Sequence, residues 1–343
     1  MSVLSYSSLT TKVRAMEGHL LTDKEYNEIK ALSSVNDVVT YLNNFKSYEK
    51  IFKNIDINSL HRGELEKLLN LSLYDDFLKL YNFASNKQRK FFRLVFMRFE
   101  CSVLKLVFRE ITEEHKVVSD LHYLIPYYRE FSKIDIEKLS ECTSIKDSIE
   151  ALKDTEYYNP LMYVFKNDSY TIFDLELDLD LFCFQTLWHN KDKVLSGTDL
   201  SLISDSYGTM MDLLNIMWVY RCKKYYKMDN EEIKALLIPV NYKLKKKELK
   251  DMIDADKIET IRDIFNRSAY GKHLHSPEAD SYEHIYKIFM DKIHKVNFKN
   301  HPYSIACVDT YLYKKQSEIG KLRTLTESIR YSLSQKEIEE ILI

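Results

Sequence analysis

The sequence predicts an all-α fold, and three observations support this prediction. Gly and Pro are scarce, with six and five residues among 343, whereas average usage is about 7% and 5%. Apolar residues recur with the 3.6-residue period of a helix along the chain, and 30% of the residues are charged. An ordered set of features also occurs three times, which predicts three related helical bundles.

The first repeated feature is a capping box, in which a Ser, Thr or Asp N-cap is followed three residues later by Glu. "LLTDKEYNEIKAL" places Thr22 as the cap and Glu25 at the third helical position. "KMDNEEIKALL" does the same with Asp229 and Glu232. Each box is flanked by apolar residues that can pack across it, so both segments are predicted helix starts.

Two further junctions follow from the same pattern. The closing "SEIGKLRTLTESIRYSLSQKEIEEILI" predicts a helix, a break at 331–333 and a last helix capped by Ser334. "EITEEHKVV" is a weaker version, with Thr112 as the cap and His115 in the place of Glu. Together the junctions predict three units, which are 1–111, 112–228 and 229–343.

Three landmarks recur between the junctions at intervals of about 110 residues. The first is a helical stretch that contains or precedes a tyrosine: 35–52 with Tyr48, 145–161 with Tyr157 and 258–274 with Tyr270. The second is an acidic residue in the next helix: Glu66, Glu176 and Glu283. The third is an acid that opens an apolar-periodic stretch and precedes an arginine: Glu100 and Arg109, Asp212 and Arg221, Glu318 and Arg323. A solenoid repeat is only about 34–47 residues long, so each unit is predicted to be a small bundle, and three such bundles suit pseudo-threefold closure.

Two interpretations of the acids Glu100, Asp212 and Glu318 stay open, and they are compatible. As structural residues, they are helix-start charges and inter-helix ion pairs that are favourable to the helix dipole. As functional residues, they form a polar ring facing a common axis, where a partner inserts.

Several kinds of chemistry are not expected. The chain contains no GxGxxG, P-loop or nucleophile elbow, so we expect neither catalytic residues nor a cofactor. "HLHSPEADSYEH" (273–284) lacks metal-ligand spacing and is predicted to be a solvated loop. The five cysteines are dispersed, which is typical of reduced thiols in a core. A net charge of −2 argues against a nucleic-acid binder.

Membrane contact has one candidate segment. The lysines of "YKLKKKELKDM" (242–252) suit either an anionic lipid surface or an acidic partner, although a solvated helix face is the favoured interpretation. Apolar runs such as 213–220 are shorter than the roughly 20 residues that span a bilayer. The first residues do not resemble a signal peptide, so we expect a cytoplasmic protein.

Three segments, in the right order along the chain, resemble the C subunit of A-type ATPases, which is named the d subunit in V-type ATPases. "TKVRAMEGHLL" resembles the family's opening through Val13, Arg14, Met16, Glu17, Leu20 and Leu21. "DLLNIMWVYRCKKYYKMDNEEIKALLIP" is similar to its middle copy through Asp212, Asn215, Ile216 and Arg221. "YLYKKQSEIGKLRTLTESIRYSLSQKEIEEIL" resembles the closing segment through Glu318, Ile319, Leu322 and Arg323, with Lys321 where Asn is common.

The resemblance implies a funnel of three bundles around a central cavity, peripheral at the cytoplasmic face of the membrane. Such a protein is non-catalytic and couples the central stalk to the proteolipid rotor ring, so that ATP turnover stays linked to H⁺ or Na⁺ transport. The candidate partner-binding residues are Arg14, Glu17, Glu100, Arg109, Asp212, Asn215, Arg221, Glu318 and Arg323. Two alternatives stay open: a free-standing helical adaptor that binds a protein in its concavity, and an all-α enzyme with a site assembled from dispersed residues.

Overall fold

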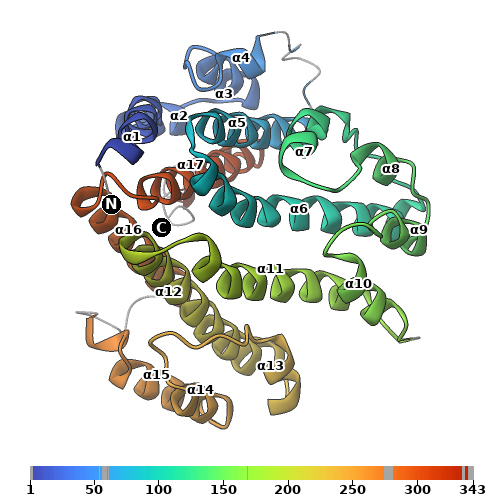
Figure 1. Ribbon diagram of the computed structural model, residues 1–343, viewed down its shortest axis with the longest axis vertical. Helices are drawn as coiled ribbons and strands as arrows, with labels where there is room; N and C mark the ends of the chain where they lie inside the picture. The colour runs from blue at the N-terminus through green and yellow to red at the C-terminus, as the bar shows by residue number, and fades with distance from the viewer. Residues whose placement is uncertain are drawn as a thin grey trace. The chain divides into compact units, whose positions relative to one another are not determined.

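The computed structural model describes residues 3–53, 55, 60, 62–167, 169–273, 281–333 and 337–338. Every regular element within these residues is a helix, so the all-α prediction is confirmed (Figure 1). The chain forms two compact units, one made of Met1–Ser85 with His294–Ile343 and the other of Asn86–Ile293. The division into 1–111, 112–228 and 229–343 stays a prediction.

The first unit combines both ends of the chain. Its two long helices, α5 and α17, pack against each other and against α1 (Figure 1). Its helices are α1 (Val3–Glu17), α2 (Asp23–Lys30), α3 (Val35–Leu42), α4 (Glu49–Phe52), α5 (Arg62–Phe83), the end of α16 (Tyr282–Asn300) and α17 (Ala306–Arg330).

The second unit is built around α6 and α11, which run side by side, and around α12 (Figure 1). Its first helices are α6 (Asn86–Glu114), η2 (His122–Leu124), α7 (Ile125–Phe131), α8 (Ile136–Ser140), α9 (Ile145–Glu150), α10 (Tyr158–Phe165) and α11 (Ile172–Val194). They are followed by α12 (Gly197–Arg221), η3 (Cys222–Tyr226), α13 (Asn230–Leu236), α14 (Lys246–Ile253), α15 (Ile258–Arg267), η4 (Gly271–His273) and the start of α16.

The repeated landmarks correspond to repeated helices. The short helices α3, α9 and α15 begin at Val35, Ile145 and Ile258, which are the predicted first residues of the three tyrosine-containing stretches. Ser34 and Ser144 cap the first two of them, and each hydroxyl accepts the backbone N–H three residues later at 3.1 Å. The third is preceded by Lys257, whose side chain makes no cap.

Two predicted capping boxes are confirmed. Thr22 caps α2 and receives the N–H of Glu25, whose carboxylate accepts the N–H of Thr22 in return. Asp229 and Glu232 form the same reciprocal pair at the start of α13, with bonds of 2.8 Å. The predicted break after the last long helix is also confirmed, because α17 ends at Arg330, while Ser334 lies outside the described residues.

The predicted helix N-cap at Thr112, with His115 at the third helical position, is wrong. Thr112 lies inside α6, where its hydroxyl donates to the carbonyl of Phe108. His115 follows the end of α6 with φ 57°, and Lys227 and Ser332 follow η3 and α17 with φ 52° and 54°. A left-handed residue is typical of a helix end rather than a helix start, although glycine usually occupies it. The segment therefore ends a helix, where the sequence predicted the start of one.

The five cysteines are buried free thiols, as predicted. The core of the second unit packs apolar residues of α12 against α13, α14 and α15, including Ile216, Ile233, Met252 and Phe265. None of the helices in the described part of the chain has both the length and the hydropathy needed to cross a membrane.

Two helical glycines have opposite surroundings and provide a matched test of the packing. A Cβ at Gly208 in α12 would overlap the ring of Tyr242. That ring packs edge-on against Trp188, with 5.9 Å between the two ring centres. We expect Gly208→Ala to lower the free energy of unfolding by about 1–3 kcal/mol, as overpacking does. Gly320 in α17 is exposed with open space around it, so Gly320→Ala should raise the free energy by up to ~1 kcal/mol. Urea unfolding of both variants measures the difference, and equal effects of the two would contradict the packing described.

Candidate functional site

Three buried tyrosines donate hydrogen bonds to three buried carboxylates. The distance between the hydroxyl oxygen and the carboxylate oxygen is 2.6 Å for Tyr48 and Glu318, 2.7 Å for Tyr157 and Glu100, and 2.6 Å for Tyr270 and Asp212. Each of the six side chains is no more than 5% exposed. The pairs therefore join two of the landmarks that recur in the sequence.

The order of pairing is cyclic along the chain. Glu100 and Asp212 pair with the tyrosines that follow them by 57 and 58 residues. Glu318 instead pairs with Tyr48, 270 residues earlier. The last acid thus binds the first tyrosine, in the unit that contains both ends of the chain.

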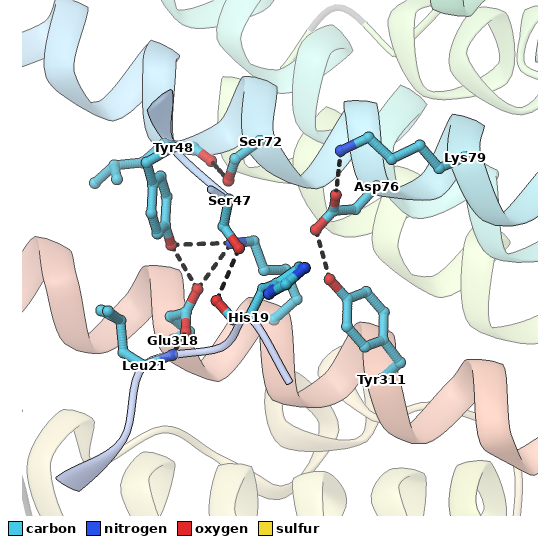
Figure 2. Close-up of polar contacts among 11 residues, drawn as sticks. His19, Leu21, Ser47, Tyr48, Ser72, Asp76, Lys79, Tyr311 and Glu318 are labelled. Carbon is cyan, nitrogen blue, oxygen red and sulfur yellow. Dashed lines mark hydrogen bonds and ion pairs between the residues drawn. The ribbon is translucent and has the colours of Figure 1, made fainter. Parts of the chain in front are cut away.

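Glu318 accepts a hydrogen bond from Tyr48 (Figure 2). It is also held by a buried ammonium group. Lys315 lies one helical turn earlier on α17, and its Nζ donates to Glu318 Oε1 at 2.8 Å and to the Tyr48 hydroxyl at 3.0 Å. The same Nζ lies 4.1 Å from the centre of the Tyr48 ring. The backbone N–H of Leu21 donates to the other carboxylate oxygen at 2.6 Å. Burial and the charge of Glu318 hold the pKa of Tyr48 well above its ordinary value, so the phenol stays the donor.

A second buried pair in the first unit lies about two helical turns before Glu318 on α17. The hydroxyl of Tyr311 donates to Asp76 at 2.6 Å, and Lys79 donates to the other oxygen of Asp76 at 2.9 Å (Figure 2). The bond from Tyr311 connects α17 to α5, whereas Lys79 and Asp76 both lie on α5. The two long helices of the unit are therefore held by a directional contact as well as by packing.

Asp212 is compensated by backbone donors. The N–H groups of Tyr242, Lys243 and Leu244 donate to its two oxygens at 3.0, 2.7 and 2.8 Å. Asp212 is fully buried, and the tyrosine and these amides solvate its charge in place of water. One turn later Asn215 exchanges two 2.9 Å bonds with the backbone of Ile238. Both side chains therefore fix the segment between α13 and α14 onto α12.

Glu100 is compensated by hydroxyl groups, which come from Tyr157 and from Ser132. Burial raises the pKa of Glu100 to about 7, although the two hydroxyls act in the opposite direction. Near neutral pH this carboxyl is thus partly protonated. The three equivalent acids are therefore compensated in three different ways.

The arginines of the predicted constellation meet other partners than these acids. Arg109 makes a two-bond ion pair with Glu176, and Arg221 lies 3.9 Å from Glu283. Arg323 donates to the amide of Asn70. Two of the arginines thus contact the second landmark series, a connection that their spacing in the sequence did not indicate.

The two predicted residues in α1 differ in their surroundings. Glu17 pairs with Lys314 of α17, whereas Arg14 is exposed. The role of the nine predicted residues in partner binding stays a prediction. Four of them are buried and bonded internally, namely Glu100, Asp212, Asn215 and Glu318.

This placement favours the structural interpretation of the acids, with a correction. Glu100, Asp212 and Glu318 lie in the middle of α6, α12 and α17, so the expectation that they open helices is wrong. Sequence reasoning also missed the tyrosines as partners, together with Lys315 and the backbone donors. The nearly equal spacing of two acids from their tyrosines, 57 and 58 residues, was the available signal.

Removing one hydroxyl tests each pair. We expect Tyr48→Phe, Tyr157→Phe and Tyr270→Phe each to lower the free energy of unfolding by about 1–3 kcal/mol, because a buried carboxylate loses a donor. Tyr163→Phe is the control, since Tyr163 is 83% exposed. Urea unfolding with circular dichroism measures the four values. Changes below about 0.5 kcal/mol in all three core variants would show that the pairs contribute nothing measurable.

The raised pKa of Glu100 predicts a specific pH dependence. Its folded-state value of about 7 lies above the ordinary value of 4.5, so its stabilising contribution is complete below pH 4.5 and is lost as the pH rises through 7. Glu100→Gln keeps the shape and removes the titration. The stability of the wild type relative to this variant should therefore fall by roughly 3 kcal/mol between pH 4.5 and 8. A difference that stays constant over this range would exclude the shifted carboxyl.

The comparisons with known proteins agree on one family. The model of the ATP synthase (C/AC39) subunit family matches residues 9–341. The C subunit of the A-type ATP synthase of Methanosphaera stadtmanae is 25% identical, over 100% of this chain and 89% of that protein. The C subunits of Pyrococcus horikoshii and Desulfurococcus sp. are 25% and 23% identical, each over 98% of this chain and 90% of their own length. The chain therefore belongs to the ATP synthase (C/AC39) subunit family.

Proposed function

We propose that this chain is a non-catalytic rotor subunit of an A-type or V-type ATPase. In this role it couples the central stalk to the membrane proteolipid ring and keeps ATP turnover linked to H⁺ or Na⁺ transport. The observation that carries the proposal is the match of the family over residues 9–341, together with relatives named as C subunits of A-type ATP synthases that align over nearly their whole length. The protein would work at the cytoplasmic face of the membrane, peripheral to it through the ring.

We further propose that three repeats of the chain close around a common axis as a funnel. The recurrence of α3, α9 and α15 at the predicted positions supports threefold repetition. Cyclic pairing of the acids with the tyrosines supports closure, because Glu318 of the last repeat uses Tyr48 of the first. A protein that transmits torque needs such closure, because the terminal bundles of an open stack would each lack a neighbour on one side and would move under load.

Partner contact is proposed at the exposed members of the predicted set. Arg14 and Arg221 are exposed, and Arg109 is exposed beside its partner Glu176. Arginine is enriched in protein interfaces because its planar guanidinium binds carboxylates with two hydrogen bonds. Arg14 offers the sharpest test, because its exposed side chain can be changed with little effect on the core.

Charge reversal at Arg14 separates assembly from folding. A tagged wild-type chain should co-purify from native membranes with the stalk subunits and the ring. We expect Arg14→Glu to reduce this recovery several-fold, with a melting temperature within about 2 °C of the wild type, because surface substitutions change stability little. The matched control is Lys153→Glu, a reversal at an exposed residue outside the predicted set.

The results of this co-purification distinguish the coupling role from the free-standing adaptor. Recovery of the tagged wild-type chain alone, from both membrane and soluble fractions, would contradict the coupling role and leave the free-standing adaptor. Normal recovery of Arg14→Glu within an assembled complex would exclude Arg14 as a contact while leaving the coupling role intact. Glu318→Lys is expected to unfold the chain instead, since its carboxylate is buried against Tyr48 and Lys315.

A further inference from the structure

The end of α12 carries a turn that the ends of α6 and α17 lack in the described residues. η3 (Cys222–Tyr226) is a π-helical turn, and the N–H of Lys227 closes it on the carbonyl of Cys222. At the other two ends the N–H groups of His115 and Tyr331 make the ordinary bond to the fourth residue back, each at 3.0 Å. π turns are rare and frequently occur at functional sites.

This turn concentrates positive charge and exposed aromatic rings. Its sequence "RCKKYYK" (221–227), here called the basic–aromatic turn, holds four cations and no acid. Tyr225 and Tyr226 are 61% and 64% exposed. Single exposed apolar side chains are common, but two adjacent exposed tyrosines among four cations form a distinct patch.

The positive charge is only partly compensated within the described chain. The closest acid in an ion pair with the turn is Glu283, 3.9 Å from Arg221. Lys223 donates to the neutral amide of Asn230 at 2.6 Å. Lys224 contacts neutral phenols, so most of the charge stays available to a ligand.

Lys224 also contacts the tyrosine rings next to it and lowers the pKa of one of them. Lys224 lies over the rings of Tyr220 and Tyr225, at 5.1 and 4.8 Å from their centres, and donates to the Tyr220 hydroxyl at 3.0 Å. Burial acts to raise the pKa of Tyr220, yet hydrogen bonds from Lys224 and Arg262 lower it below its ordinary value. Lys224 is thereby held over the aromatic rings.

We propose that the basic–aromatic turn docks on an anionic lipid surface. Tyrosine is enriched at the membrane interface, where its ring lies at headgroup level and its hydroxyl stays hydrated. Lysine and arginine next to the ring interact with the lipid phosphates, each adding about fivefold to the affinity. Charge complementarity supports this choice of ligand, because the turn carries four cations and no acid and the headgroup layer is anionic. The proposal goes beyond the coupling function and does not require it.

Vesicle binding by the purified full-length chain tests the proposal. We expect sedimentation with vesicles of phosphatidylcholine containing about 30 mol% phosphatidylglycerol, and little with phosphatidylcholine alone. Tyr225→Ser combined with Tyr226→Ser should reduce binding at least tenfold, and Lys223→Gln combined with Lys224→Gln by about 25-fold. Thermal melting checks that both double variants remain folded.

Two control variants give the test its specificity. Lys245→Gln combined with Lys246→Gln removes the same charge from the exposed basic run at the start of α14, and Tyr163→Ser removes an exposed tyrosine elsewhere. Both should bind as the wild type does. If the α14 variant lost as much vesicle binding as the Lys223→Gln and Lys224→Gln variant, net charge alone would drive binding and the proposal would be wrong. An absence of wild-type binding to the anionic vesicles would also overturn the proposal. Binding of the turn to polyglutamate but not to vesicles would assign it to an acidic protein instead. None of these results bears on co-purification with the stalk and ring.

Discussion

The buried hydrogen bond between a tyrosine and a carboxylate is the interaction on which the rest of this structure depends. A carboxylate removed from water is costly unless donors surround it, so each acid in α6, α12 and α17 requires a partner at a fixed place. That partner is a tyrosine of a distant helical segment, at 2.6–2.7 Å. Apolar packing tolerates sliding of one helix on another, whereas a bond of this length fixes their register. The three pairs therefore specify which segment packs on which long helix.

The same problem has three chemical solutions in this chain. Asp212 uses three backbone amides, Glu318 uses the ammonium of Lys315 and one amide, and Glu100 uses hydroxyls and a raised pKa. The solution at Glu318 holds the N-terminal and C-terminal segments together, and it is the one with a full opposite charge. A buried ion pair contributes little net stability, but breaking it leaves an uncompensated charge and is strongly destabilising. The cluster therefore makes the pairing of the N-terminal and C-terminal segments specific, and substitution of Lys315 or Glu318 alone is expected to be strongly destabilising.

These buried clusters also bear on where partners bind. Because the acids are satisfied within the chain, a partner gains little from reaching them. The exposed groups are different in kind: arginines at Arg14, Arg109 and Arg221, and the tyrosines and lysines of the basic–aromatic turn. The proposed contacts therefore lie at the surface, apart from the buried tyrosine–carboxylate pairs.

The sequence by itself determined the helical class, two capping boxes and the first residues of three short helices. Low Gly and Pro content, capping boxes at Thr22 and Asp229, and the starts at Val35, Ile145 and Ile258 are local signals, because helix period and capping depend on neighbours within four residues. Only the tertiary structure decided which landmarks meet. Tyr157 follows Glu100 by 57 residues and Tyr48 precedes Glu318 by 270, and no local rule relates residues so distant. The polarity of the boundary at His115 was decided there too, since a weak cap signal competes with the packing of a 29-residue helix. Burial, which makes these acids internal hydrogen-bond acceptors, is a property of the folded chain that sequence spacing does not contain.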